Sequence, residues 1–427
     1  MDGMDNSSVT RRDFVKTAAA ASVAAAIPGN LGLFAAGSDA LKVGVIGCGG
    51  RGTGAAIDCL NAAPGVEIVA LGDLVPDRVQ SSLKKLKEAF PSRVNVPADR
   101  CFTGFDNYLQ VCACPDVNLI VTAAPPGFRP IHLKAAIEAG KHVFMEKPAA
   151  VDPVGVRSVI ALSDLAKQKG LAVVAGTQRR HQTHYLEIMK RIQDGQIGEI
   201  VAAQCYWNQG DLWVKKREPE MSEIEWQCRN WLYFSWLSGD HIVEQHVHNI
   251  DVVNWAMGTM PKNIVGMGGR QVRVAPEYGN IFDHFYIEFE YPNGVRVSSM
   301  CRQTKGCAER VEERIVGTEG VAHCTGSTGE IKGKKPWKFE GKEINPYVQE
   351  HADLVASIRN GKVLNEGRQI AESTMCAIIG RMSAYTGRAI SWEWAMNSST
   401  LDLSPAKCEF GPNPVDEVAI PGVTQLI

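Results

Sequence analysis

Apolar runs alternate with amphipathic stretches in the first part of the chain. Segments 41–46, 66–71, 117–122, 141–145 and 171–176 are short and apolar, which predicts buried strands, and helical patterns lie between several of them. Strands that alternate with helices build a parallel sheet with helices on both faces. The pattern therefore predicts a doubly wound α/β domain over residues 41–176.

The pattern changes after residue 176. Segments 199–207, 284–290, 295–297, 311–316 and 321–323 predict further strands, several of which alternate polar and apolar positions. The turn residues at 291–294 predict a hairpin between two of these strands. We expect a second α/β domain over residues 177–390 with a large, mostly antiparallel sheet. Its open face is expected to join subunits into a dimer or tetramer.

Helical patterns accompany this second sheet. One runs from Tyr185 to Ile192 and ends at Gly195, and two more occupy 346–360 and 369–385. The helices at 346–385 are expected to pack back on the first domain. A polar, proline-bearing tail is predicted at 391–427.

The N-terminal segment carries a targeting pattern. Residues 10–16 read TRRDFVK, and an alanine-rich, weakly apolar run follows up to Pro28. This pattern resembles a twin-arginine export signal, so we assign residues 1–37 to the signal and expect a periplasmic or otherwise exported protein. The apolar run is too short for a membrane span, and none is expected in the mature protein.

Composition adds limits on partners and redox chemistry. The chain has 427 residues, 45% hydrophobic content and a net charge of −2, which is typical of a globular protein and gives no reason to expect a nucleic-acid partner. Its twelve cysteines are scattered without the spacing of a zinc site, so buried, inert thiols are expected. Folding in a reducing cytoplasm before export also argues against a disulfide framework.

A glycine-rich loop follows the first predicted strand. Residues 47–52 read GCGGRG, a GxGxxG motif with a strand before it and a helix after it. Its glycines allow a tight turn and close approach of a pyrophosphate, and the helix N-terminus attracts the phosphates. Asp73 lies 21 residues beyond Gly52, at the end of the second strand. A carboxylate there accepts ribose hydroxyls and repels a 2′-phosphate, which predicts NAD rather than NADP.

Further nucleotide contacts are expected beyond the carboxyl ends of the later strands, where doubly wound sheets bind their ligands. Lys147 follows the segment 141–145, which places it near the nicotinamide. The predicted cofactor-binding residues are Gly47, Cys48, Gly49, Gly50, Arg51, Gly52, Asp73, Thr122, Ala123, Pro125, His132, Glu146, Lys147 and Gln178.

A cluster of histidines and acids occupies residues 239–251, which read GDHIVEQHVHNID. If these residues form one helix, His246 points away from a face that carries four of the others. Those four are His241, Glu244, His248 and Asp251. Three interpretations stay open: an acid/base site, a structural network of hydrogen-bonded histidines, and a metal site. Because the chain lacks an HExxH motif, we predict no metal. His241 stays undecided and is the candidate ligand if a metal binds.

Several stretches together resemble the Gfo/Idh/MocA family of glucose–fructose oxidoreductase and inositol dehydrogenase-like proteins. They are VGVIGCGGRG at 43–52, GD at 72–73, GKHVFMEKP at 140–148, QRRH at 178–181, the stretch at 239–251, and EGRQIAESTMCAIIGRMSAYTGR at 366–388. The resemblance spans nearly all of the chain after Leu41. It implies an N-terminal Rossmann domain, a C-terminal α/β domain, and hydride transfer on a sugar or cyclitol.

The resemblance also implies roles for individual residues. Lys147 lies near the nicotinamide and the reacting hydroxyl, His248 acts as the acid/base, and Glu244 stands where the family usually has Asp. Histidine suits proton removal because its pKa lies near neutral pH, and an ammonium stabilises a developing alkoxide. The predicted catalytic residues are Lys147, His248 and Glu244. The predicted substrate-binding residues are Arg180, His181, Tyr206, Trp207, His241 and Asp251. The two aromatic side chains among them offer faces that stack on sugars.

Export constrains the reaction, because free NAD is not expected outside the cytoplasm. A tightly bound cofactor that is reduced and reoxidised within one catalytic cycle meets this constraint. Hydride exchange between two sugars, epimerisation, and glycoside cleavage through oxidation, elimination, hydration and reduction all fit it. A non-catalytic sugar-binding protein on the same fold is the alternative. We expect a small-molecule sugar, cyclitol or glycoside as the ligand in either case.

Overall fold

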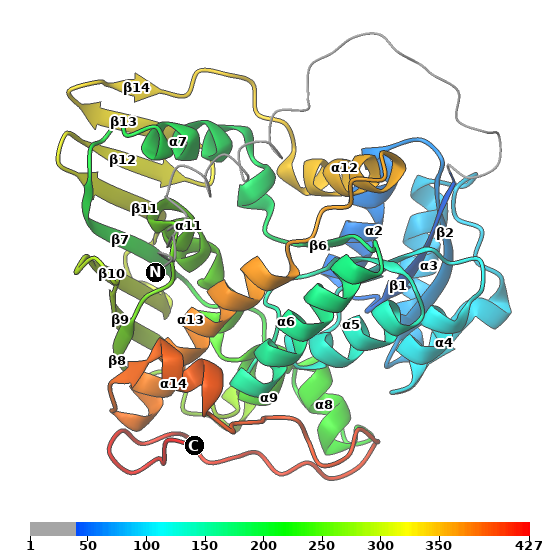
Figure 1. The fold of residues 1–427 in the computed structure, drawn as a ribbon. Helices are drawn as coiled ribbons and strands as arrows, with labels where there is room; N and C mark the ends of the chain where they lie inside the picture. Colours follow the sequence, from blue (N-terminus) through cyan, green and yellow to red (C-terminus); the bar gives the residue numbers. More distant parts are fainter. Residues whose placement is uncertain (1–39) are drawn as a thin grey trace, which may run out of the picture. The chain divides into compact units, whose positions relative to one another are not determined.

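The structure, a computed structural model, describes residues 40–427, and the predicted export signal at 1–37 lies outside this part of the chain. A six-stranded parallel sheet comes first, in the order β3-β2-β1-β4-β5-β6 (Figure 1). Its strands are β1 (Leu41–Ile46), β2 (Val66–Asp73), β3 (Cys101–Thr103), β4 (Leu119–Thr122), β5 (His142–Met145) and β6 (Val173–Ala175). The strand order reverses between β1 and β4, which is where such sheets bind ligands.

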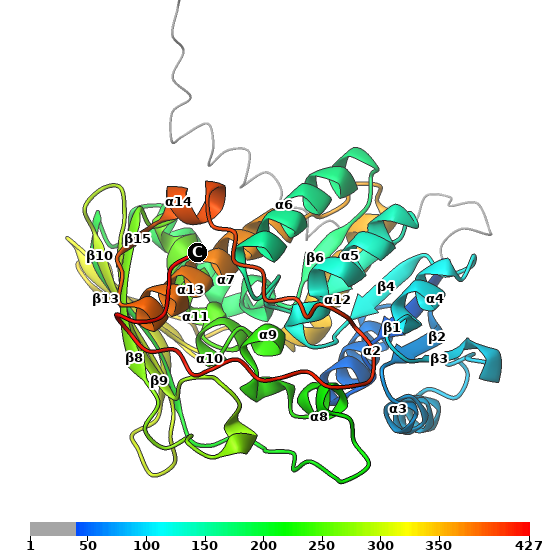
Figure 2. The ribbon, with the colours of Figure 1, turned by 90° about the horizontal axis from the view of Figure 1, so that it is seen from below.

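Helices cover both faces of this sheet (Figure 2). They are α2 (Gly50–Ala62), α3 (Pro76–Ala89), α4 (Asn107–Ala113), α5 (Arg129–Glu138) and α6 (Pro153–Gln168). Consecutive residues of β1 from Val43 to Ile46 are therefore buried on both faces of the sheet, which explains the apolar sequence of this part of the strand. The doubly wound sheet predicted from the sequence is confirmed, whereas the three residues of β3 are too few to give a pattern.

A nine-stranded sheet follows, in the order β14-β13-β12-β11-β7-β10-β9-β8-β15. Its strands are β7 (Ile200–Gln209), β8 (Asn263–Gly269), β9 (His284–Glu290), β10 (Arg296–Gln303), β11 (Arg310–Gly317), β12 (Gly320–Thr325), β13 (Gly329–Gly333), β14 (Trp337–Lys338) and β15 (Ile390–Ser391). The β7–β10 pair is parallel and the other pairs are antiparallel. The predicted mostly antiparallel sheet is confirmed.

Helices lie against one face of the nine-stranded sheet (Figures 1 and 2). They include α7 (Thr183–Gln193), α10 (His241–Glu244), α11 (Val247–Met257) and α13 (Gly367–Thr386). Strand β9 shows how the sequence sets this sidedness, because Phe285, Ile287 and Phe289 are buried while His284 and Tyr286 are exposed. Helix α13 also packs on α6, and α12 (Pro346–Arg359) packs on α2.

The predicted single helix through residues 241–251 is wrong. Helix α10 ends at Glu244 and α11 begins at Val247. The backbone N–H of His246 donates to the carbonyl of His241, five residues earlier, so one residue bulges out of the regular ladder. The His246 side chain can then lie beside Ser299 of β10, with its Nε2 2.6 Å from the hydroxyl. The cluster therefore spreads over two short helices that are separated by Gln245 and His246.

The C-terminal residues form one more helix, and the chain after this helix has no regular secondary structure. Helix α14 (Trp392–Asn397) follows β15, so ordered structure continues past Thr386. The remaining chain runs across α9 (Ser235–Ser238) and α8 (Glu223–Arg229) (Figure 2). All twelve cysteines are free thiols and nine of them are buried, as expected. Within residues 40–427, no helix has the length and apolar character that a membrane crossing requires.

A buried ion pair joins the end of the first sheet to the second. Arg179 follows β6 in a short 3-10 turn, and its Nη1 lies 2.5 Å from Glu313 Oε1 of β11. Tyr185 and Asn249 also donate hydrogen bonds to the Glu313 carboxylate, at 2.9 and 2.5 Å. Burial raises the pKa of Glu313, and Arg179 opposes that rise.

We predict that Arg179→Leu destabilises the fold by about 3–5 kcal/mol, because it leaves a buried carboxylate without its cation. The pKa of Glu313 rises further in this variant, above its value in the unfolded chain, so the variant is most stable at low pH and loses stability as pH rises. Urea unfolding at acidic and alkaline pH measures both effects. The double variant R179L/E313Q should recover part of the loss and flatten the pH dependence; equal stability of both variants at every pH contradicts the assignment.

Candidate active site

The glycine-rich loop between β1 and α2 is shaped by close backbone contacts. Gly47 has a φ of +90°, and its N–H donates to Gly72 O at 2.8 Å. A Cβ atom on Gly52 would lie 1.7 Å from Gly47 O, so only glycine fits there. In contrast, Cβ atoms on Gly49 and Gly50 would meet nothing within 4 Å. The loop thus leaves open space directly before the N-terminus of α2, where a phosphate group is favoured.

Asp73 ends β2 beside this loop and is held by backbone donors. The Cys48 N–H donates to Oδ2 at 2.6 Å, and the Val75 N–H donates to Oδ1 at 3.2 Å. Arg78 of α3 lies 4.0 Å from Oδ1. Burial raises the pKa of Asp73, while Arg78 and the backbone donors oppose the rise.

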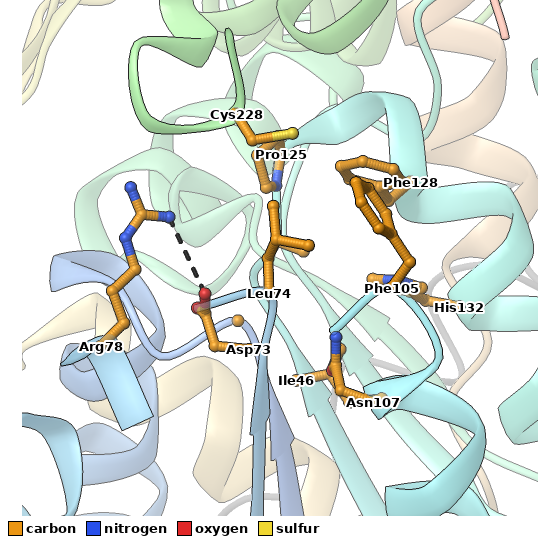
Figure 3. Close-up of a pocket in the computed structure, with 12 residues that line it drawn as sticks. Ile46, Asp73, Leu74, Arg78, Phe105, Asn107, Pro125, Phe128, His132 and Cys228 are labelled. Carbon is orange, nitrogen blue, oxygen red and sulfur yellow. Dashed lines mark ion pairs between the residues drawn. The ribbon is translucent and has the colours of Figure 1, made fainter. Parts of the chain in front are cut away.

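Asp73 and Arg78 line a small cavity of about 40 Å³ at the carboxyl ends of β1, β2 and β4 (Figure 3). Its wall is mainly apolar and aromatic. The other lining residues are Ile46, Gly47, Leu74, Phe105, Asn107, Ala124, Pro125, Phe128, His132 and Cys228. A carboxylate at the rim of an apolar slot suits the ribose and adenine of a dinucleotide.

The end of β4 is organised by a buried guanidinium. Arg129 donates to the carbonyls of Thr122 and Ala124, at 2.9 Å each. His132 Nδ1 lies 3.3 Å from the Thr122 hydroxyl. Burial first, and Arg129 second, lower the pKa of His132 to about 3, so the ring is neutral. Ala123 faces Gly52, with its Cβ 3.4 Å from the position that a Gly52 side chain would take.

The end of β5 is joined to the glycine loop by charge. Arg51 Nε lies 2.5 Å from Glu146 Oε1, and the same guanidinium reaches Asp58 at 3.0 Å and Glu350 of α12 at 3.5 Å. Its centre lies 4.9 Å from the ring of Tyr347. Gln178 donates to the Tyr347 hydroxyl at 3.4 Å. Arg51, Glu146 and Gln178, all predicted to bind the cofactor, therefore lie close together, and Tyr347 and Glu350 of α12 contact them.

These features fit a nicotinamide dinucleotide. The loop offers open space at a helix N-terminus, Asp73 offers a fixed carboxylate, and the slot beside it offers apolar walls.

Lys147 and Glu244 meet across the two sheets. Lys147 follows β5, and its Nζ lies 2.8 Å from Glu244 Oε1 at the end of α10. The ammonium also donates to the Glu244 carbonyl. Glu244 Oε2 is buried and has no hydrogen-bond partner among residues 40–427. An acceptor left open beside an ammonium is suited to a hydroxyl-bearing ligand.

His248 lies next to this pair on α11. Burial, followed by the charges of Lys147 and Arg179, lowers its pKa well below the ordinary value. Its ring stacks on Trp207, with centroids 5.8 Å apart. The ring Nδ1 is buried and finds no hydrogen-bond partner in the described part of the chain. His248 is therefore a neutral imidazole with an open acceptor or donor position.

Arg180 and Asp251 form a bidentate ion pair at the side of this site. Their hydrogen bonds are 2.8 and 2.9 Å long, and Ser373 donates a third hydrogen bond to Asp251 at 2.8 Å. His181 Nδ1 lies 2.6 Å from Asp353, and its Nε2 lies 3.2 Å from Glu366. Burial lowers the pKa of His181, but the two carboxylates outweigh it and raise the pKa to about 10.

Two predicted substrate-binding residues do not join this group. Tyr206 lies on the opposite face of β7 from Trp207, in register with Met300 and under the guanidinium of Arg310. His241 packs edge-on against Phe285. The charges that lower its pKa after burial are those of Arg273 and His246, not Lys147. The structure thus divides the 239–251 cluster into two sets with different surroundings.

Several residues of the site have no clear sequence signal. Arg129 and Glu350 are buried charges within helices, and Cys228 reaches the nucleotide slot from a distant segment. Arg78 has a weak signal, because it follows Asp73 by five residues in the same strand–helix turn. Within residues 40–427, no group of three or more His, Cys, Asp or Glu side chains is placed to hold a metal ion.

We predict that Gly52→Ala and Gly49→Ala separate folding from nucleotide binding. Gly52→Ala forces the loop apart and lowers the melting temperature of the nucleotide-free protein by several degrees, about 1–3 kcal/mol in stability. Gly49→Ala leaves the melting temperature unchanged but weakens binding, because its methyl group enters the open space over the helix N-terminus. Calorimetric titration with NAD measures the second effect. Undiminished NAD affinity in Gly49→Ala contradicts this placement of the phosphates.

We predict that Lys147→Met raises the pKa of His248, because it removes the positive charge that lowers this pKa most. The pKa stays below the ordinary value, since burial and Arg179 remain. Histidine ring signals followed by NMR across pH, assigned with a His248→Asn variant, measure the shift. A pKa that stays at its wild-type value indicates that the two groups do not interact.

The chain matches two known protein families in sequence. Residues 41–177 match an oxidoreductase family with an NAD-binding Rossmann fold, and residues 185–323 match the GFO/IDH/MocA C-terminal domain.

The chain is also similar to curated proteins, at low sequence identity. Glycosyl hydrolase family 109 protein 4 of Phocaeicola vulgatus is 24% identical over 312 residues, and inositol 2-dehydrogenase/D-chiro-inositol 3-dehydrogenase of Lactiplantibacillus plantarum is 24% identical over 282. These matches span 71% and 66% of this chain, and 57% and 70% of the relatives. The match to glycosyl hydrolase family 109 protein 3 of Phocaeicola vulgatus, at 28% identity, spans 47% of this chain and 36% of that relative. The chain therefore spans well under two thirds of the length of these two glycosyl hydrolase relatives.

Solved structures share the fold. The aldose-aldose oxidoreductase of Caulobacter crescentus superposes with a TM-score of 0.64 at 18% identity, covering 82% of this chain and 99% of that one. An NAD binding oxidoreductase of Klebsiella pneumoniae gives 0.66 at 17% identity, covering 83% and 99%. The two family matches, in order along the chain, agree with the two sheets and with the glycine loop and Lys147. The chain belongs to the Gfo/Idh/MocA family of oxidoreductases.

Proposed function

We propose that this protein is a nicotinamide-dependent oxidoreductase acting on a CH–OH group of a sugar, cyclitol or glycoside. The observation that carries the proposal is the meeting of Lys147, Glu244 and His248 beside the glycine loop. Two of these side chains present buried polar atoms without partners, Glu244 Oε2 and His248 Nδ1. Because these two atoms belong to side chains that meet at one site, they suit the hydroxyls of a polar ligand.

A bound nicotinamide supplies hydride transfer, and the chain supplies proton transfer and charge stabilisation. A neutral His248 takes the hydroxyl proton as the alcohol is oxidised. The Lys147 ammonium, fixed by Glu244, stabilises negative charge on the same oxygen. Trp207 stacks on the imidazole and restricts its orientation. Arg180 and Asp251 hold each other, so we assign them to the wall around the substrate.

Several relatives support a sugar-like substrate. Their names describe an inositol dehydrogenase and an aldose-aldose oxidoreductase. Two others are named as glycosyl hydrolase family 109 proteins, which favours a second candidate function: glycoside cleavage in which the oxidation is reversed before product release. The same three residues serve both reactions, because both begin with removal of a hydroxyl proton and a hydride.

We propose NAD as the cofactor, held tightly enough to be reduced and reoxidised in place. The fixed carboxylate of Asp73 supports NAD over NADP, because it faces the ribose position and repels a 2′-phosphate. The twin-arginine motif at residues 10–16 supports export, and a cofactor that stays bound suits a compartment without free NAD.

We also propose that the open face of the nine-stranded sheet joins copies of the chain. Met267, Tyr286, Met300 and Tyr206 lie in register across β8, β9, β10 and β7 on this face. Met267 lies on β8 near one edge of the sheet and is 71% exposed, which is high for a large apolar side chain. Light scattering of wild type and Met267→Lys tests the proposal, since a charge within an apolar interface should give monomers.

The test of function is product analysis with protein purified in its mature form. We expect bound nucleotide that is released on denaturation, and turnover of at least one sugar or glycoside without added NAD. We predict that His248→Ala lowers kcat by about 10²–10⁴-fold while nucleotide remains bound. His323→Ala, on β12 far from this site, is the matched control and should leave kcat unchanged. Full turnover by His248→Ala rejects the catalytic assignment.

A further inference from the structure

The nucleotide slot has a cover that comes from the second half of the chain. Residues between β7 and α10 form α8, a short turn, and α9, and they share a small apolar core. Leu74, Phe105 and Phe128, which wall the slot, pack against this core. Cys228 of α8 itself lines the slot, above Leu74 and Pro125 (Figure 3). Helix α8 therefore covers one side of the slot.

Two contacts fix this cover to the nucleotide-binding half. Arg229 of α8 donates to both carboxylate oxygens of Asp77 in the first turn of α3, at 3.1 and 2.9 Å. A Cβ atom on Gly127 would lie 2.2 Å from the carbonyl of Trp236, so the backbone of α9 rests directly on the loop after β4. The Arg229–Asp77 ion pair is partly exposed to solvent. The contact between Gly127 and Trp236 can change only if the backbone moves.

The C-terminal segment straps the outer side of α8. The Ile224 N–H donates to Gly411 O at 3.3 Å, and the Asn413 N–H donates to Glu223 Oε2 at 3.0 Å. The Gln227 side-chain amide donates to the backbone carbonyl of Asn413 at 2.5 Å, and the Asn413 side-chain amide donates to Gln227 Oε1 at 2.8 Å.

The same segment also reaches a slot wall. The ring of Phe410 lies 5.2 Å from that of Phe105, between centroids, so an aromatic contact joins the strap to the slot. The strap crosses α8 in Figure 2 as the last, red part of the chain.

We infer that α8 and residues 410–413, which we call the clasp, retain the adenosine half of the dinucleotide. The inference rests on the nucleotide site proposed above. Cys228 of α8 lines the slot, and Phe410 of the strap packs on its wall residue Phe105, so a nucleotide seated in the slot is covered on this side. Release past this side requires the clasp to shift. Each shift breaks the Arg229–Asp77 pair and the strap hydrogen bonds together, which makes release slow.

The clasp supplies a physical reason for a cofactor that stays bound through many turnovers. Its residues act on retention and not on the reacting atoms, so they are positioning residues. Their substitution should change the rate of nucleotide release more than the stability of the fold.

The experiment measures release of bound NADH by its fluorescence after excess NAD is added. We predict that Phe410→Ala/Asn413→Ala releases NADH about tenfold faster than wild type, and that Arg229→Ala does so by a smaller factor because its pair is partly exposed. Lys190→Ala, which removes an exposed ion pair with Asp194 at the end of α7, is the matched control and should release at the wild-type rate. Melting of the nucleotide-free proteins checks that each variant folds.

A second measurement varies ionic strength and begins with the wild-type protein. Salt screens the Arg229–Asp77 pair, so release from wild type should accelerate with ionic strength, and Arg229→Ala should lose that dependence. Wild-type release rates in every clasp variant, with NADH still bound, overturn the clasp and leave the nucleotide site standing. Failure of wild type to bind NADH at all overturns both.

Discussion

The Lys147–Glu244 ion pair is the contact on which the candidate site depends. Lys147 comes from the end of a parallel strand and Glu244 from a one-turn helix that packs on the other sheet, so the pair forms only when both halves are correctly docked. It fixes a cation where the first sheet binds its ligand. The pair also uses one carboxylate oxygen of Glu244 and leaves the other, Oε2, as a hydrogen-bond acceptor for a ligand.

Charge around His248 follows from that docking. The histidine is buried, and the positive charges of Lys147 and Arg179 also lower its pKa, so its neutral form is favoured. Arg179 is itself held by Glu313 of the second sheet. The pKa of a residue that the sequence predicts as an acid/base is therefore shifted by two cations that are both more than sixty residues away from it in the sequence. Nearby charges act in the opposite direction at His181. The carboxylates of Asp353 and Glu366 raise its pKa, so this histidine stays protonated.

Retention of the cofactor depends on different residues from those that recognise it. The glycine loop and Asp73 recognise phosphates and ribose with backbone geometry that is local in sequence. The cover over the adenosine end uses α8 and the last residues of the chain, which approach from far away. Recognition and retention therefore draw on different parts of the chain, and one can change without the other.

The sequence by itself determined the two sheets, the nucleotide loop and the position of Lys147, because each depends on periodicity or on a motif of neighbouring residues. The break between α10 and α11, the placement of Tyr206 on the far face of β7, and the separation of His241 from Lys147 were decided by tertiary packing. A helical stripe at 241–251 is the simplest reading of that segment, but burial of His246 against Ser299 favours a bulge. Cys228, Phe410 and Arg229 carry no local signal, since their role exists only where distant segments meet.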